Sequence, residues 1–321
     1  MQVLVLHSDI APDAPPDELD TLVTADAVVH ALEAGGHRVT RAAFAPDPKA
    51  LKAITADADA VFNLVESVGG NGLAAAIAPA MLEQLGLRYT GGTAAAIALT
   101  GDKPAAKRIL RAAGLPTPNW AEPPRWEGLG MARMIVKSAT EDASIGLDDG
   151  AVVAGRAAVR ARAADSAARF GGRWFAEAYV EGREFNVAIF EDADGPRLLP
   201  LAEMRFVDWA AERPKIVGYA AKWDDGSPDA TATVRAFGIE AREPTLAAAL
   251  RDLSLKAWTL FGLRGYARVD FRVDEADALT ILEINPNPCL EPLAGFAAAA
   301  AEAGLSYDAL IAHILDAATN D

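Results

Sequence analysis

The 321-residue sequence predicts a protein of mixed α/β and α+β class that contains three compact units. Over residues 1–98, short apolar strands alternate with helical segments, which is typical of a mostly parallel sheet. In the rest of the chain, segments with the pattern of strands follow one another closely. In the last pair, within Gly265–Leu290, side chains alternate between two faces as in a β-hairpin. Because 51% of the residues are hydrophobic, the chain can bury a core in each unit.

The first unit is expected to span residues 1–98. The pattern predicts strands at residues 2–6, 38–44, 60–65 and 88–90 and helices at 20–34 and 73–85. The glycine-rich loop Glu66–Gly72 follows a strand, at the edge where open α/β sheets bind ligands. It lacks the spacing of known phosphate-binding loops, so a plain turn and a substrate-binding loop both remain open.

The second unit is expected at residues 99–180. Asp102 can cap a helix at 104–113, because its carboxylate can accept hydrogen bonds from free N–H groups and Pro104 suits a first turn. Strands are expected at 134–137 and 174–180, and a helix at 155–170. The small polar loop Ser138–Gly146 can fold over phosphate groups and offer them backbone N–H donors.

The third unit is expected at residues 181–321. Its strands are expected at 183–190, 198–205 and 215–223, and its helices at 244–260, 295–303 and 307–317. The strand at 183–190 follows 174–180 after the turn Glu181-Gly182, so these two strands are expected to form a hairpin.

The last hairpin carries the polar residues that say most about function. On the first strand, Tyr266, Arg268, Asp270 and Arg272 are expected to share one face. On the second strand, the residues expected to share one face are Leu279, Ile281, Glu283 and Asn285. Pairing can therefore bring Asp270 beside Glu283 and Asn285. Two carboxylates and an amide oxygen are hard ligands that suit Mg2+. A solvated hairpin face also explains the alternation, although a carboxylate within the apolar run Ile281–Ile284 is unusual for an exposed edge.

Charge and composition limit the partners to be expected. The net charge is −15 and the pI about 4.7, so the acidic surface would repel a nucleic-acid backbone. The single cysteine, Cys289, excludes an internal disulfide and a multi-cysteine metal site. The sequence has no signal-peptide pattern and no apolar run of membrane-spanning length, so a soluble, cytoplasmic protein without a membrane partner is expected.

A series of short motifs has the order and spacing of a known family. They are Tyr89-Thr-Gly-Gly, Gly101-Asp-Lys103, Ile135-Val-Lys137, Glu141-Asp-Ala-Ser-Ile-Gly146, Ala176-Glu177-Ala-Tyr-Val-Glu-Gly-Arg-Glu184, Ala221-Lys222-Trp223, Gly265-Tyr-Ala-Arg-Val-Asp270 and Leu282-Glu-Ile-Asn285. On these motifs the chain resembles the ATP-grasp superfamily, and within it the D-alanine–D-alanine ligase branch, from about Val61 to about Ile314. The resemblance implies an ATP-grasp fold: an N-terminal parallel-sheet (pre-ATP-grasp) domain at 1–98, then two lobes that hold ATP, a central lid at 99–180 and a metal-binding lobe at 181–321.

The resemblance also implies roles for single residues. Those that would bind ATP are Lys103 and Lys137 at the phosphates, Ser144 in the covering loop, Glu177 with the backbone of Ala178 and Val180 at the adenine, and Glu184 at the ribose. Asp270, Glu283 and Asn285 would hold two Mg2+ ions, or Mn2+, at the transferred phosphoryl group. Arg268 and Lys222 would stabilise the charge that develops during transfer. Taken one at a time, these lysines and glutamates could equally be surface charges.

The implied reaction joins a carboxylate to an amine with ATP. The carboxylate attacks the γ-phosphate, and the amine then captures the acyl phosphate, which gives an amide or peptide bond, ADP and phosphate. The resemblance implies amino acids or small carboxylic acids as substrates and is compatible with a homodimer. An ATP-binding sensor of the same fold, without turnover, is the alternative function.

The chain also departs from the family pattern. The Gly-Gly-x-Ser-x-Glu loop expected after the first strand is absent from residues 7–20. Ala143 stands where a serine is expected, Trp223 where a tyrosine is expected, and Cys289 where a glycine offers its N–H to the substrate carboxylate. A ligase for a different carboxylate and a different amine is therefore expected. Cys289 raises a separate hypothesis, a cysteine nucleophile, which would need a histidine beside it.

Overall fold

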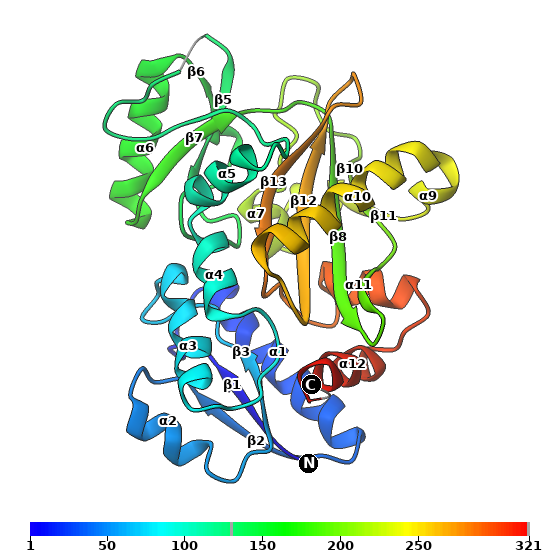
Figure 1. The fold of residues 1–321 in the computed structure, drawn as a ribbon. Helices are drawn as coiled ribbons and strands as arrows, with labels where there is room; N and C mark the ends of the chain where they lie inside the picture. The colour runs from blue at the N-terminus through cyan, green and yellow to red at the C-terminus, as the bar shows by residue number, and fades with distance from the viewer. Residues whose placement is uncertain (129–130, 320–321) are drawn as a thin grey trace.

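The computed structural model describes residues 1–128 and 131–319, and within these ranges the chain forms three sheets (Figure 1). The first sheet is parallel, in the order β2-β1-β3, as the alternation of strands and helices predicted. Its strands are β1 (Gln2–His7), β2 (Arg38–Ala43) and β3 (Ala60–Leu64). The helices in this part of the chain are α1 (Pro16–Ala34), α2 (Pro48–Ile54), α3 (Ile77–Gln84) and α4 (Ala94–Gly101), with the 3-10 helix η1 at Gly72–Ala76.

Local sequence explains how α1 begins and ends. Pro16 stands at its start, where no N–H partner is needed, and Asp17 and Glu18 lie in the first turn, where acidic side chains favour the helix dipole. The helix ends before Gly35-Gly36, and Gly36 adopts a φ of 81°, which glycine reaches without strain. The strand expected at residues 88–90 is present only as one parallel bridge between Val61 and Tyr89.

The second sheet is antiparallel, in the order β4-β7-β5-β6. Its strands are β4 (Trp120–Ala121), β5 (Arg133–Ser138), β6 (Val152–Ala154) and β7 (Trp174–Ala178). Its helices are α5 (Lys103–Ala112), α6 (Arg156–Phe170) and the short η2 (Asp149–Ala151). The cap expected for α5 is confirmed, because the Asp102 carboxylate accepts a hydrogen bond of 3.0 Å from the Ala105 N–H.

The third sheet has the order β11-β10-β8-β12-β13, with β9 paired to β8. Its strands are β8 (Arg183–Asp192), β9 (Gly195–Leu198), β10 (Ala202–Phe206), β11 (Thr233–Ala236), β12 (Tyr266–Val273) and β13 (Leu279–Asn285). The helices of this part are α7 (Tyr219–Trp223), α8 (Pro228–Ala232), α9 (Ile239–Arg242), α10 (Pro244–Phe261), α11 (Gly295–Glu302) and α12 (Tyr307–Thr319). Helix α10 packs on one face of the sheet, where Leu250 lies in the same core cluster as Val269.

Within the described ranges, no helix is both long and apolar enough to cross a membrane.

Three further expectations about strands are wrong. The segments 174–180 and 183–190 do not form a hairpin, because β7 pairs with β4 and β5 whereas β8 pairs with β9, β10 and β12. Residues 215–223 end in helix α7, whose alanines favour a helix. The strand expected at 198–205 is divided into β9 and β10 by Leu199–Leu201, since Pro200 has no N–H for a ladder.

The hairpin β12–β13 contains a β-bulge that its alternation did not reveal. Asp270 pairs with Glu283, but the next residue, Phe271, pairs with Ile281. Leu282 is therefore the extra residue, without a partner on β12. One extra residue reverses the alternation of everything that precedes it on its strand.

The bulge corrects the expected face of the second hairpin strand. Glu283 and Asn285 lie on the face of Asp270, as expected, but Leu279 and Ile281 do not share that face. Ile281 is fully buried in the core on the opposite side of the sheet. The bulge thus lets one strand bury its apolar residues and still turn Glu283 and Asn285 toward the polar face.

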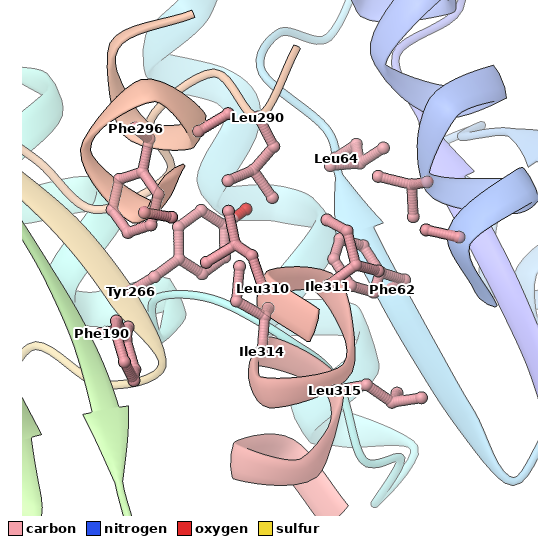
Figure 2. Close-up of a cluster of buried hydrophobic side chains, with 14 of the residues drawn as sticks. Phe62, Leu64, Phe190, Tyr266, Leu290, Phe296, Leu310, Ile311, Ile314 and Leu315 are labelled. Atoms are coloured by element: carbon pink, nitrogen blue, oxygen red, sulfur yellow. The ribbon is translucent and has the colours of Figure 1, made fainter. Parts of the chain in front are cut away.

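The C-terminal helix α12 joins the first sheet to the third. Figure 2 shows this core, with Phe62 and Leu64 from β3, Phe190 from β8, Tyr266 from β12 and Leu310, Ile311, Ile314 and Leu315 from α12. Leu310 and Ile311 are fully buried between them. Burial of such side chains contributes about 1.5–3 kcal/mol each. The first and third sheets are therefore held together by one continuous apolar core.

Candidate active site

A cavity of about 930 Å³ lies where the three sheets come together. Its walls include the loops after β3 and β5, the end of β7, helix α7 and the polar face of the third sheet. Every candidate residue lines it: Lys103, Lys137, Ser144, Glu177, Ala178, Val180, Glu184, Lys222, Arg268, Asp270, Glu283 and Asn285. Residues from distant parts of the chain thus line one cavity.

The oxygen-rich part of the cavity is the polar face of β12 and β13. Asp270 lies directly opposite Glu283, and Arg268 opposite Asn285. The Asp270 carboxylate accepts two hydrogen bonds of 2.8 Å from the Arg268 guanidinium and one of 2.8 Å from the Asn186 amide. The described residues contain no group of three or more histidine, cysteine or acidic side chains that could hold a metal. A cation here would depend on two carboxylates and an amide, an all-oxygen set that fits Mg2+.

Positively charged side chains surround these oxygens. The Lys103 ammonium lies 3.8 Å from a Glu283 oxygen and is 7% exposed. Burial opposes ionisation of Glu283, but the charges of Lys103, Lys137 and further cations outweigh it and lower the pKa of Glu283 to about 2. Burial and the charge of Arg268 lower the pKa of Lys222, which also faces the cavity. The cations are therefore gathered where a polyphosphate would need them in an acidic protein.

Glu177 and Glu184 are not exposed charges on a hairpin, which was the alternative interpretation of each. Glu177 is 1% exposed, and its two oxygens lie 2.5 Å from the Lys137 ammonium and 2.6 Å from the Lys107 ammonium. Burial opposes its ionisation, but the two lysines outweigh this effect and lower the pKa of Glu177. Glu184 is 13% exposed and binds Arg272 at 2.8 Å. Both carboxylates are therefore fixed in the cavity wall by cations.

The backbone after β7 offers one N–H donor to the cavity, that of Val180. The N–H of Ala178 donates to the Asn119 carbonyl, and that of Tyr179 donates to the Arg133 carbonyl. Among residues 1–128 and 131–319, the Val180 N–H forms no hydrogen bond with a backbone carbonyl. Since Val180 lines the cavity, its N–H can serve a planar ring with an acceptor nitrogen.

The covering loop, Ser138–Gly146, lies against helix α7 and the segment before it. The Ser144 hydroxyl donates to the Val217 carbonyl at 2.9 Å. The Trp223 indole N–H donates to the Ala143 carbonyl, also at 2.9 Å. Ala143 and Trp223, two of the departures from the family pattern, therefore contact each other and hold the loop closed without a serine and a tyrosine.

The glycine-rich loop Glu66–Gly72 borders the same cavity. Glu66 lines it, and the Gly72 N–H donates to the Glu141 carboxylate of the covering loop at 3.2 Å. Burial and the charges of Asp20 and Asp142 raise the pKa of Glu66 to about 8. The loop is therefore part of the site, which favours a substrate-binding loop over a plain turn.

Lys107, Asn186 and Arg235 are residues of this region that the sequence analysis missed. Lys107 stands one turn after Lys103, so the helical spacing could have placed both on one face of α5. Asn186 stands two positions after Glu184 on a strand, so it shares the face of that residue. Arg235 lines the cavity from β11, and no motif in the sequence points to it.

Cys289 does not have the surroundings of a nucleophile. Its thiol donates to the Asp20 carboxylate at 3.0 Å and lies 3.8 Å from the Thr24 hydroxyl. Burial and the charges of Glu66 and Asp20 raise the pKa of the thiol, which opposes thiolate formation. No histidine binds it in the part of the chain that the structure describes. The hypothesis of a cysteine nucleophile is therefore not supported.

Comparison with known proteins agrees with this geometry. The family model for the D-ala D-ala ligase C-terminus matches residues 128–316. An uncharacterized protein of Sinorhizobium fredii, y4sG, is 32% identical over 319 residues, which are 95% of this chain and 90% of that protein. The D-alanine–D-alanine ligase of Desulforudis audaxviator is 34% identical over 244 residues, 73% of this chain and 74% of the ligase.

Solved structures show the same fold. The D-alanine–D-alanine ligase of Bacillus anthracis, complexed with ATP, superimposes with a TM-score of 0.76 at 20% identity, over 100% of this chain and 98% of that one. The ligase of Coxiella burnetii gives a TM-score of 0.73 at 18% identity, over 100% of this chain and 95% of that one. The chain therefore belongs to the D-alanine–D-alanine ligase family of the ATP-grasp superfamily and is an ATP-dependent, ADP-forming carbon–nitrogen ligase of that type.

Proposed function

We propose that this ligase joins a small carboxylate to an amine through an acyl phosphate, with Mg2+, and that neither substrate is D-alanine. The observation that carries the proposal is the distribution of charge in the cavity. Lys103, Lys137 and Lys222 gather with Arg268 around an all-oxygen face, in a chain with a net charge of −15. Such a chain would repel a triphosphate unless a local group of cations neutralised it.

The lining residues support one orientation of the nucleotide. The Val180 N–H and the Ala178 carbonyl would bind the adenine edge, and Glu184 would accept hydrogen bonds from the ribose. Lys103 and Lys137 would then contact the phosphates, since both reach the cavity next to the Glu283 region. The base would then lie beside the end of β7, and the triphosphate would point to the polar face of the third sheet.

Glu177 and Ser144 support this arrangement from the cavity wall. Glu177 borders the adenine position and holds the Lys137 ammonium with its carboxylate. Ser144 fixes the covering loop to the Val217 carbonyl. A closed loop excludes water, so that an acyl phosphate reacts with the amine rather than hydrolysing.

Asp270, Glu283 and Asn285 would hold the Mg2+ ions, for which Mn2+ could substitute. When bound, the metal would neutralise the phosphate oxygens and fix the phosphoryl group for in-line transfer. Arg268 lies beside this face and would stabilise the negative charge on the attacking carboxylate and on the tetrahedral intermediate. Lys222 faces the same space and would share that charge.

The part of the cavity lined by Cys289 and Glu291 supports substrates other than D-alanine. Cys289 and Glu291 line it where the family pattern has a glycine and hydroxyl groups that hold a carboxylate. A carboxylate side chain there would repel the carboxylate of a second amino acid, and the Cys289 side chain narrows the space. The acceptor is therefore expected to be an amine without a carboxylate at that position.

ADP release in the presence of Mg2+ tests the function. Amines and small carboxylic acids are offered in pairs, and one pair is expected to raise ADP formation at least about tenfold over ATP alone. Lys222→Met should lower that turnover at least about tenfold, whereas Lys256→Met, on the exposed side of α10, should not change it. Conversion of D-alanine alone to its dipeptide would contradict the substrate assignment. Magnesium-dependent nucleotide binding without turnover for any pair would favour an ATP sensor.

A further inference from the structure

Helix α5 carries two buried lysines one turn apart that point to different surroundings. Lys103 is 7% exposed, lines the cavity and lies 3.8 Å from Glu283. Lys107 is 1% exposed and lies behind the cavity wall. A buried ammonium is costly unless all its donors are used, so the contacts of Lys107 need an explanation.

The Lys107 ammonium has three partners: two hydrogen-bond acceptors and one carboxylate with which it forms an ion pair. It donates to the Thr117 hydroxyl at 3.1 Å and to the Leu282 carbonyl at 3.0 Å, and it lies 2.6 Å from the Glu177 carboxylate. The partners belong to the chain after α5, to β13 and to β7. One side chain therefore connects the strand that borders the nucleotide to the strand that carries the metal-binding oxygens.

The contact with Leu282 falls on the β-bulge. Leu282 is the extra residue of β13, and the residue after it is Glu283. Thr117 completes the support, because its hydroxyl donates to the Ile281 carbonyl at 2.9 Å. Lys107 and Thr117 thus bind the two successive carbonyls of the bulge. Without the bulge, Ile281 and Glu283 would share one face of β13.

The contact with Glu177 reaches the phosphate side of the cavity. The same carboxylate binds Lys107 through one oxygen and Lys137 through the other, at 2.6 Å and 2.5 Å. Lys137 is 12% exposed and lines the cavity. Removing the Lys107 charge would leave Glu177 with Lys137 alone, and the shared carboxylate could then shift.

We infer that Lys107 is a positioning residue: it holds the bulge that turns Glu283 toward Asp270, and through Glu177 it fixes Lys137 in the cavity wall. The inference rests on the proposed function, because Glu283 and Lys137 matter in this way only if Mg2+ and a polyphosphate bind there. Lys107 contacts neither the cavity nor the reacting atoms and acts through its neighbours.

The test measures magnesium-dependent nucleotide binding. In Lys107→Met, the side chain remains long and unbranched but ends one atom earlier, without the ammonium. By titration calorimetry with a non-hydrolysable ATP analogue, the Mg2+ concentration for half-maximal binding should rise at least about tenfold. The kcat should fall by a similar factor, and the KM of the carboxylate substrate should change less than about twofold. Lys256→Met, an exposed lysine of α10, is the matched control and should change neither.

A second variant covers the case in which Lys107→Met does not fold. Thr117→Val keeps the shape and the Lys107–Glu177 pair but removes the hydroxyl that binds Ile281 and Lys107. It should raise the same Mg2+ concentration about two- to fivefold, as a weaker loss of the same support. A wild-type Mg2+ dependence in folded Lys107→Met, or in Thr117→Val, would overturn the inference while the proposed function stands. Nucleotide binding by the wild-type protein that ignores Mg2+ would overturn both.

Discussion

Glu283→Gln keeps the size of the side chain at the centre of the oxygen-rich face but removes its charge. In the folded chain, the charges of Lys103, Lys137 and Arg268 outweigh burial and lower the pKa of Glu283 from 4.5 to about 2. At about 1.4 kcal/mol per pKa unit, this lowering corresponds to about 3 kcal/mol of stability at neutral pH. The variant loses that contribution and leaves the cations without their common partner.

The sign of the pH dependence follows from the same values. Because the pKa of Glu283 is lower in the folded chain than in the unfolded one, its contribution is complete above about pH 5 and is lost as the pH falls toward 2. About 2 kcal/mol of it should remain at pH 3.5. The difference in free energy of unfolding between wild type and Glu283→Gln should therefore decrease from about 3 kcal/mol at pH 7 to about 2 kcal/mol at pH 3.5.

Urea unfolding without nucleotide at the two pH values measures this gap. Glu275→Gln is the matched control, because Glu275 is exposed in the turn of the same hairpin, and it should stay within about 0.5 kcal/mol of wild type. A loss of less than about 1 kcal/mol in Glu283→Gln at pH 7 would refute the argument from the surrounding cations. So would a gap that stays constant or widens as the pH falls.

Further predictions concern stability and the covering loop. Leu310→Ala in the fully buried core between the two sheets should cost about 2–5 kcal/mol by urea unfolding, whereas Leu293→Ala, at a side chain 83% exposed, should change little; equal effects would contradict the role of that core. Asp102→Ala should lower the free energy of unfolding by about 1 kcal/mol through loss of the α5 cap, and an unchanged melting temperature would argue against the cap. Trp223→Phe should release the Ala143 carbonyl, at a cost of about 1 kcal/mol, and speed limited proteolysis within the covering loop; an unchanged cleavage rate would show that this contact does not hold the loop.

Local pattern was sufficient for much of the fold and for choosing the candidate residues that line the cavity. The buried strands β1 and β3, the capped helix α5 and the amphipathic helix α10 depend on residues that are neighbours in sequence, so their patterns predict them. The candidate residues stand in short motifs at the ends of such elements. The oxygens of the last hairpin suited a divalent metal by residue type, whereas the lysines were assigned to phosphates only through the resemblance of their motifs to a known family.

Tertiary structure decided what depends on partners far along the chain. The turn between β7 and β8 has the sequence of a hairpin, yet the strands join different sheets because each finds its partners elsewhere. Alternation placed Glu283 correctly and Ile281 on the wrong face, because β13 has a bulge at Leu282. The carbonyls of this bulge accept hydrogen bonds from Lys107 and Thr117, which lie far away in the sequence. A sequence records which side chains can pair, but pairing and burial are set by what packs against them, and only the folded chain determines that.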